Sequence, residues 1–194
     1  MSELPTLQFF NKKDSDILNV LLHGGNFNIE TPFMQKLFNL SWKKGRSSVS
    51  FNFPYIDRGD KTASSNLDEE IKILQKVLDF VEYRSYSKIH FIGKSMGAIV
   101  AGKFLKQKKL DYKKYSITVL GYVTEGIDIK DFKGNITIIQ GSKDKFGNIE
   151  KVKEDMGVLS DRVRYFEING AEHSFKDSEG KETYVDEAFS KIDF

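Results

Sequence analysis

A serine between two glycines, placed directly after an apolar run, constrains this chain more than any other feature. Residues 89–92 are Ile-His-Phe-Ile, and the next five are Gly93-Lys94-Ser95-Met96-Gly97. This spacing favours a strand, a sharp turn that holds the serine, and a helix that starts at the following residue. The two glycines let the strand and the helix approach each other without a Cβ clash. The segment therefore predicts a strand–turn–helix unit in which the Ser95 hydroxyl is exposed as a candidate nucleophile.

Segments typical of strands and helices alternate along the rest of the chain. Apolar or alternating runs predict strands at residues 17–22, 48–53, 88–92, 115–122, 135–140 and 162–168. Helical spacing of apolar residues predicts helices after Thr31-Pro32, after a capping box at Asn66–Glu69, over 96–108, after Asn148 and over 185–192. This alternation predicts an α/β fold, with a mostly parallel sheet flanked by helices on both faces in one domain spanning residues 1–194.

Charge and composition exclude several classes of function. The chain has 30 basic and 28 acidic residues and a net charge of +2, so we expect neither a nucleic-acid partner nor a basic membrane anchor. It has no cysteine, which excludes disulfides and thiolate chemistry. The N-terminal residues lack a signal-peptide pattern, and no run approaches the ~20 apolar residues of a membrane span. We therefore expect a cytoplasmic protein without a membrane partner.

A serine nucleophile needs a base, and the chain has three histidines that can be compared. His90 lies inside the strand that precedes Ser95, so we interpret it as a core residue of the sheet. His23 directly follows a predicted strand and precedes two glycines, so we interpret it as structural. His173 lies in the loop after the last predicted strand, and that loop can reach the turn that holds Ser95. We therefore predict that His173 is the base.

The base in turn needs an orienting acid, which should lie between the serine and the histidine in the sequence. Asp144 follows the predicted strand 135–140, in a loop bounded by Gly141 and Gly147 that suits a tight strand end. Asp128, in the preceding loop, is the competing candidate. A solvated loop carboxylate is the alternative interpretation of Asp144. We predict Asp144 as the acid.

Backbone N–H groups are expected to stabilise the oxyanion that forms during acyl transfer. One donor should be Met96, the residue after the nucleophile, and the second should be Gly25 or Asn26, after the first buried strand. Tyr55 and Arg58 follow the strand 48–53 and are candidate substrate-binding residues, since an arginine can hold a carboxylate by a forked pair. A surface arginine is the alternative for Arg58. No cluster of His, Asp and Glu has the spacing of a metal site.

Taken together, these motifs resemble the α/β-hydrolases. More narrowly, the chain is similar to the small dienelactone-hydrolase-like group that includes the testis-expressed hydrolase-like proteins and their bacterial relatives. The matching segments, in order, are His23-Gly24-Gly25, Phe51-Asn52-Phe53-Pro54-Tyr55, Gly93-Lys94-Ser95-Met96-Gly97, Leu120-Gly121-Tyr122, residues 140–147 and His173-Ser174-Phe175-Lys176. The resemblance implies Ser95, Asp144 and His173 as catalytic residues and no cofactor. One departure is Val123, where related sequences often have proline.

We therefore expect a serine hydrolase that acts on a small carboxylic ester. Ser95 would attack the ester carbonyl, His173 would transfer the proton, and Asp144 would orient the imidazole. A non-catalytic interaction module on the same fold, and a thioesterase or acyltransferase using the same residues, remain alternatives. Only about a dozen residues separate the predicted strands 115–122 and 135–140. This connection is too short for a lid domain, so we expect a minimal α/β-hydrolase fold with an open site.

Overall fold

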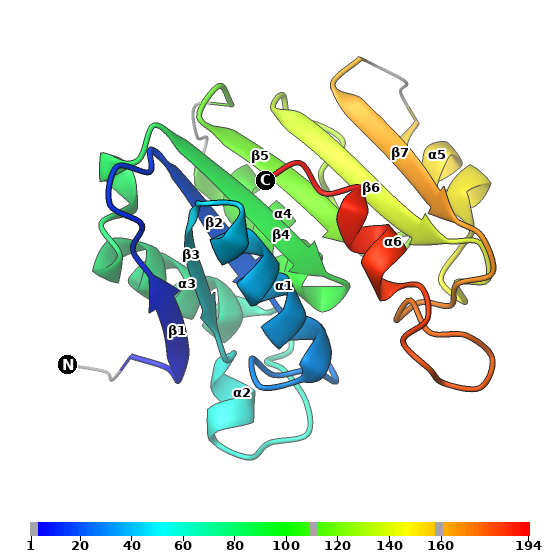
Figure 1. Cartoon of the computed structure of the whole chain (residues 1–194), viewed down its shortest axis with the longest axis horizontal. Coiled ribbons are helices and arrows are strands. Elements are labelled where there is room, and N and C mark those ends of the chain that lie inside the picture. Colours follow the sequence, from blue (N-terminus) through cyan, green and yellow to red (C-terminus); the bar gives the residue numbers. More distant parts are fainter. Residues whose placement is uncertain (1–3, 109–111, 158–160) are drawn as a thin grey trace.

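The computed structural model describes residues 4–108, 112–157 and 161–194. Seven strands form one sheet in the order β1-β3-β2-β4-β5-β6-β7 (Figure 1). The strands are β1 (Leu7–Phe10), β2 (Ile17–Leu22), β3 (Ser47–Phe51), β4 (Lys88–Lys94), β5 (Tyr115–Leu120), β6 (Asn135–Gly141) and β7 (Val163–Ile168). The pair β1 and β3 is antiparallel, and the other five neighbouring pairs are parallel. This confirms the predicted α/β class and the mostly parallel sheet.

Helices cover both faces of the sheet. They are α1 (Pro32–Lys43), α2 (Pro54–Asp57), α3 (Asp68–Phe80), the 3₁₀ helix η1 (Tyr83–Ser85), α4 (Met96–Lys108), α5 (Ile149–Met156) and α6 (Val185–Ser190). Figure 1 shows α1 and α6 in front of the sheet and α3 and α4 behind it. Neighbouring strand residues enter different cores: Phe91 packs with the α3 and α4 side, and Ile92 with the α1 and α6 side. Strands buried on both faces explain the continuous apolar runs of the sequence.

Several predicted segment ends were wrong, among them that of the strand predicted at 115–122, which is β5 and ends at Leu120. Two others have a clear local cause. The strand predicted at 48–53 is β3 and ends at Phe51, because Pro54 begins α2 and the chain turns away from the sheet. The predicted capping box at Asn66 is not formed, because Leu67 adopts a left-handed conformation before α3 begins. Instead the Ser64 hydroxyl accepts from the Glu69 N–H at 3.3 Å and donates to the buried Glu70 carboxylate at 2.5 Å.

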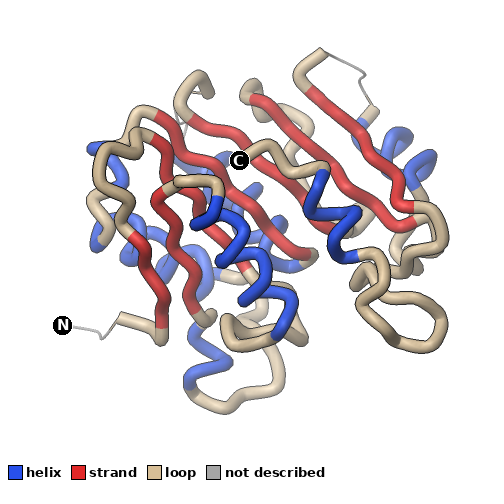
Figure 2. Tube along the Cα trace, in the orientation of Figure 1, coloured by secondary structure: helices blue, strands red, loops and turns tan. Residues whose placement is uncertain are grey.

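The parallel strands present their following loops at one edge of the sheet. Figure 1 shows the arrowheads of β4, β5, β6 and β7 pointing toward the same edge, and Figure 2 shows the loops that leave it. The connection from β5 to β6, residues 121–134, contains only turns and bends, so no lid domain covers this edge. Within the described ranges, no helix is long and apolar enough to cross a bilayer.

Candidate active site

Ser95 lies at the turn between β4 and α4, as the sequence predicted. Its φ is +50°, a left-handed value that costs a non-glycine residue about 1 kcal/mol or more. The flanking glycines make this turn possible. A Cβ at Gly93 would lie 2.5 Å from the Ala98 nitrogen, and a Cβ at Gly97 would lie 2.3 Å from the Leu22 carbonyl oxygen. The strand and the helix therefore pack too closely here for any residue other than glycine.

His173 and Asp144 are joined by a short hydrogen bond. The His173 Nδ1–H donates to Asp144 Oδ2 at 2.6 Å, and the Asp144 side chain is fully buried. The other carboxylate oxygen accepts from the Phe146 N–H at 2.9 Å. Burial lowers the pKa of His173 below its usual value, while the hydrogen bond to Asp144 acts in the opposite direction. A neutral imidazole held in one tautomer by a buried carboxylate is suited to act as a base.

Ser95 and His173 line the same pocket, which has a volume of about 200 Å³. Gly121 follows β5 with a φ of +73°, and a Cβ there would lie 3.0 Å from His173 Cε1, so this glycine lets the ring approach. Among the described residues, the His173 ring forms one side-chain hydrogen bond, to the Asp144 carboxylate. Ser95 and His173 therefore share a pocket wall but are not themselves hydrogen-bonded. Such bonds are often loose without a substrate.

The three candidate oxyanion-hole residues Gly25, Asn26 and Met96 line this pocket beside Ser95. The loop that holds Gly25 is fixed by a hydrogen bond from a buried tyrosine. The Tyr55 hydroxyl donates to the Gly25 carbonyl at 2.8 Å, and burial raises the pKa of Tyr55 to about 12. Tyr55 is 1% exposed and is absent from the pocket wall, so the structure places it as a support of this loop, whereas we had expected it to bind substrate.

His23 supports the same loop, which confirms its structural interpretation. Its Nδ1–H donates to the Gly24 carbonyl at 2.8 Å, and its Nε2 accepts from the Phe53 N–H at 3.0 Å. Burial lowers the pKa of His23 to about 4, so the ring is neutral near pH 7. His90 is also buried, with its Nε2 2.8 Å from the Thr118 hydroxyl, and it lies in the sheet away from Ser95.

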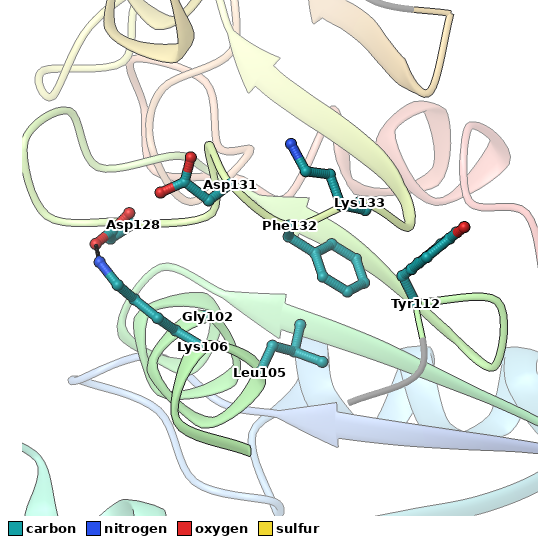
Figure 3. A pocket seen from close by; sticks show the side chains of 8 residues that line it. All are labelled: Gly102, Leu105, Lys106, Tyr112, Asp128, Asp131, Phe132 and Lys133. Atoms are coloured by element: carbon teal, nitrogen blue, oxygen red, sulfur yellow. Dashed lines mark hydrogen bonds and ion pairs between the residues drawn. The ribbon is translucent and has the colours of Figure 1, made fainter. Parts of the chain in front are cut away.

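Two further candidates from the sequence lie outside the pocket. Arg58 is an exposed residue whose guanidinium pairs with Asp60 and Glu69, both at 2.8 Å, and it does not line the pocket of Ser95. Its position matches the surface-arginine alternative. Asp128 pairs with Lys106 at a different hollow of about 200 Å³ beside α4 (Figure 3). The structure thus brings Asp144 to His173 and leaves Asp128 elsewhere.

Several pocket residues were missed by the sequence analysis. Phe146 packs edge-on against the His173 ring, with centroids 4.7 Å apart, and Lys94 and Lys145 line the pocket. One indication of the two lysines as pocket residues was present in the sequence: Lys94 directly precedes Ser95, and Lys145 directly follows Asp144. In the described part of the chain, no group of three or more His, Asp or Glu residues could hold a metal ion.

Comparisons with known proteins agree with this fold. The profile of the family described as "Alpha/beta hydrolase domain" matches residues 15–192. A search of curated proteins found no match. Among solved structures, an alpha-beta serine hydrolase homologue from Coxiella burnetii is 20% identical with a TM-score of 0.75, and the match covers 95% of this chain and 88% of that one.

Two other solved structures are similar at lower identity. An α/β serine hydrolase without a lid from Xanthomonas campestris is 15% identical with a TM-score of 0.68, and the match covers 86% of this chain and 78% of that one. Est1E from Butyrivibrio proteoclasticus, solved with ferulic acid, is 11% identical with a TM-score of 0.71. The match covers 95% of this chain and 91% of that one. At these identities the likeness supports the fold. Because the family profile spans nearly the whole chain, the protein belongs to the alpha/beta hydrolase family, and hydrolysis is the class of activity that this membership supports.

Proposed function

We propose that this protein is a serine hydrolase that cleaves carboxylic esters with Ser95, His173 and Asp144. The observation that supports the proposal best is the 2.6 Å hydrogen bond from His173 to the buried Asp144, at the wall of the pocket that contains Ser95. A strained serine, a neutral imidazole and a buried carboxylate together are typical of an activated nucleophile. The lid-free edge favours a small, accessible ester over a lipid that needs an apolar cover.

In the proposed mechanism, Ser95 Oγ attacks the ester carbonyl carbon while His173 Nε2 takes the hydroxyl proton. Asp144 accepts the Nδ1–H, which keeps the unprotonated Nε2 free for Ser95 and stabilises the imidazolium. The oxyanion receives the Met96 N–H and a second N–H from Gly25 or Asn26. Collapse expels the alcohol, which takes its proton from His173 and leaves an acyl-enzyme. Water then attacks with His173 as base, which releases the acid and restores Ser95.

The proposal is tested with a fluorophosphonate probe, which reacts with activated serines. The wild type should be labelled, and Ser95→Ala should not. Ser87→Ala is a suitable control, because Ser87 lies before the opposite end of the same strand. Equal labelling of Ser95→Ala and the wild type would contradict the assignment. A panel of matched esters, thioesters and amides then distinguishes an esterase from a thioesterase, and the absence of labelling would favour an interaction module.

A further inference from the structure

A buried glutamine interrupts the apolar run of β6 just before the loop that holds Asp144. The strand reads Asn135-Ile-Thr-Ile-Ile-Gln140-Gly141, and Gln140 is fully buried. Burying an amide is costly unless it forms hydrogen bonds, so a glutamine at this position needs partners. Gln140 does not line the pocket of Ser95, so contact with a substrate does not explain its presence. Its partners within the protein therefore indicate what it does.

The Gln140 amide bonds to backbone on two neighbouring loops. Its Oε1 accepts from the Tyr122 N–H at 2.6 Å. Its Nε2 donates to the Gly147 carbonyl at 2.6 Å and to the Tyr122 carbonyl at 3.3 Å. The N–H needs an acceptor and the carbonyls need donors, so the amide fits here in one orientation. Gln140 thus joins the turn after β5 to the far end of the loop 141–147, which we call the acid loop.

Asp144 lies in the middle of the acid loop, between two backbone hydrogen bonds. The Asp144 N–H donates to the Gly141 carbonyl at 3.1 Å, and the Gly147 N–H donates to the Asp144 carbonyl at 3.1 Å. Gly147 has a φ of +130°, which favours glycine at this point. The direction of the Asp144 side chain therefore depends on how both ends of this short loop are held.

A second side chain from the turn after β5 holds the same end of the acid loop. The Thr124 hydroxyl donates to the Phe146 carbonyl at 2.6 Å, and Gln140 binds the carbonyl of the next residue, Gly147. Two consecutive carbonyls are thus fixed. The N–H of Phe146 donates to Asp144 Oδ1 at 2.9 Å. The segment that Gln140 and Thr124 hold is therefore the one that binds the carboxylate of the acid.

The other side of the acid loop is bonded to the loop after β7, which carries the candidate base. The Lys143 N–H donates to the Ala171 carbonyl at 3.0 Å, and the Gly170 N–H donates to the Ser142 hydroxyl oxygen at 2.8 Å. The acid loop is held between the loop after β7 and the turn after β5. Gln140 provides most of the side-chain hydrogen bonds on the β5 side.

We propose that Gln140 is a positioning residue, which keeps the Asp144 carboxylate against His173 by holding the end of the acid loop. It acts through Gly147 and Phe146, and Phe146 also packs against the His173 ring. A catalytic group displaced by about 1 Å can lose a large part of its effect. The inference rests on the proposed function for the catalytic part of His173 and Asp144. The positioning itself can be measured without any substrate.

The kinetic test replaces Gln140 by methionine, which keeps the length of the side chain and removes its hydrogen bonds. Gln140→Met should lower kcat roughly tenfold and change KM by less than about twofold. Asn19→Leu is the matched control, because Asn19 is also a fully buried amide of the sheet, with its Nδ2 donating to Ser41 Oγ at 2.7 Å. The control can lose stability but should keep kcat per folded molecule, which circular dichroism quantifies.

A spectroscopic test reports on His173 directly. The hydrogen bond of one ring nitrogen decides which nitrogen carries the proton in a neutral imidazole. Nitrogen NMR of ¹⁵N-labelled histidine, with His173→Ala for assignment, should show the Nδ1–H form of His173 in the wild type. Gln140→Met should shift His173 toward the Nε2–H form that a free imidazole prefers, and Asn19→Leu should not.

The two tests separate this inference from the proposed function. If Gln140→Met shifts the tautomer of His173 and the wild type hydrolyses no ester, the positioning stands and only the proposed function fails. A wild-type tautomer in folded Gln140→Met, or an equal shift in Asn19→Leu, would overturn the inference.

If Gln140→Met does not fold, Thr124→Val decides, because it removes the hydrogen bond to the Phe146 carbonyl from a partly exposed side chain. Thr124→Val should shift the His173 tautomer in the same direction and lower kcat about two- to threefold. A Thr124→Val variant with the wild-type tautomer and kcat would then refute the role of this anchor.

Discussion

At the scale of single residues, burial and partners give the three histidines different chemistry. His23 and His90 are buried with neutral hydrogen-bond partners, and burial lowers the pKa of each to about 4. His173 also has a lowered pKa, but it is the histidine bound to a carboxylate and placed in the pocket of Ser95. A base must be neutral at rest and must become stable as a cation during the reaction, which the Asp144 charge provides for His173.

His173→Ala should therefore lower turnover of an activated ester by roughly 10³-fold or more without unfolding the protein. His90→Gln is the control: it can lower stability, because His90 is buried in the sheet, but turnover per folded molecule should be retained. Both are measured by ester kinetics together with circular dichroism. A collapse of turnover in folded His90→Gln with a functional His173→Ala would mean that the base was assigned to the wrong histidine.

Asp144→Asn should cut kcat by something like 10²–10⁴-fold, with a smaller effect on KM, since an amide there favours the wrong imidazole tautomer. Asp128→Asn is the matched comparison, because Asp128 pairs with Lys106 away from the pocket and should change kcat little. Steady-state kinetics of both variants on one ester decide between them. The opposite result would assign the acid to the loop after β5.

Lys94 should make stability depend on pH. Burial lowers the pKa of Lys94 from its ordinary 10.5 to about 7, with Asp144 acting in the opposite direction. Between about pH 7 and 10.5 the unfolded chain binds the Lys94 proton more strongly, so this residue makes the free energy of unfolding rise with pH there. Below about pH 7 both states are protonated, and the full cost of the buried charge is present.

Lys94→Met removes that cost while keeping the length of the side chain. The variant should be more stable than the wild type at pH 6, by on the order of a few kcal/mol, and the difference should shrink toward pH 10. Urea unfolding at both pH values measures it, with exposed Lys145→Met as the control. A Lys94→Met variant that is destabilised equally at both pH values would show that Lys94 acts there by packing alone.

At the scale of elements, local sequence and packing together determine two features. These are the turn between β4 and α4 and the start of α3. The turn between β4 and α4 needs its glycines because neighbouring backbone leaves no room for a Cβ, as the Leu22 carbonyl oxygen does at Gly97. The second depends on Ser64, whose hydroxyl links the Glu69 N–H to the buried Glu70 carboxylate. Because Leu67 adopts a left-handed conformation, Asn66 is separated from the capping position that its spacing predicted.

Ser64→Ala should consequently lower the free energy of unfolding by about 1–2 kcal/mol, since it removes a helix cap and a hydrogen-bond partner of a buried carboxylate. Asn66→Ala should cost much less, because the structure gives its side chain no capping bond. Urea denaturation of the two variants provides the comparison. A larger loss for Asn66→Ala would restore the capping box that the sequence predicted.

At the scale of the whole molecule, the sheet order determines which loops can meet. Ser95 follows β4, while Asp144 and His173 follow β6 and β7. These strands lie in the order β4-β5-β6-β7 and point the same way, so their loops emerge at one edge. Gly121, after the intervening β5, leaves space for the His173 ring to cross toward Ser95. The absence of a lid in the β5–β6 connection leaves this edge open.

The sequence by itself determined the α/β class, six of the seven strands and the candidate set Ser95, Asp144 and His173, whereas the edge strand β1 was not predicted. These depend on short-range patterns: apolar runs, glycines at a turn and the order of motifs along the chain. Only the tertiary structure decided that Asp144 meets His173, that Tyr55 supports a loop, and that Arg58 stays on the surface. Those outcomes depend on distances between residues far apart in sequence, which packing sets. The buried Lys94 ammonium, which has no hydrogen-bond partner among the described residues, became visible for the same reason.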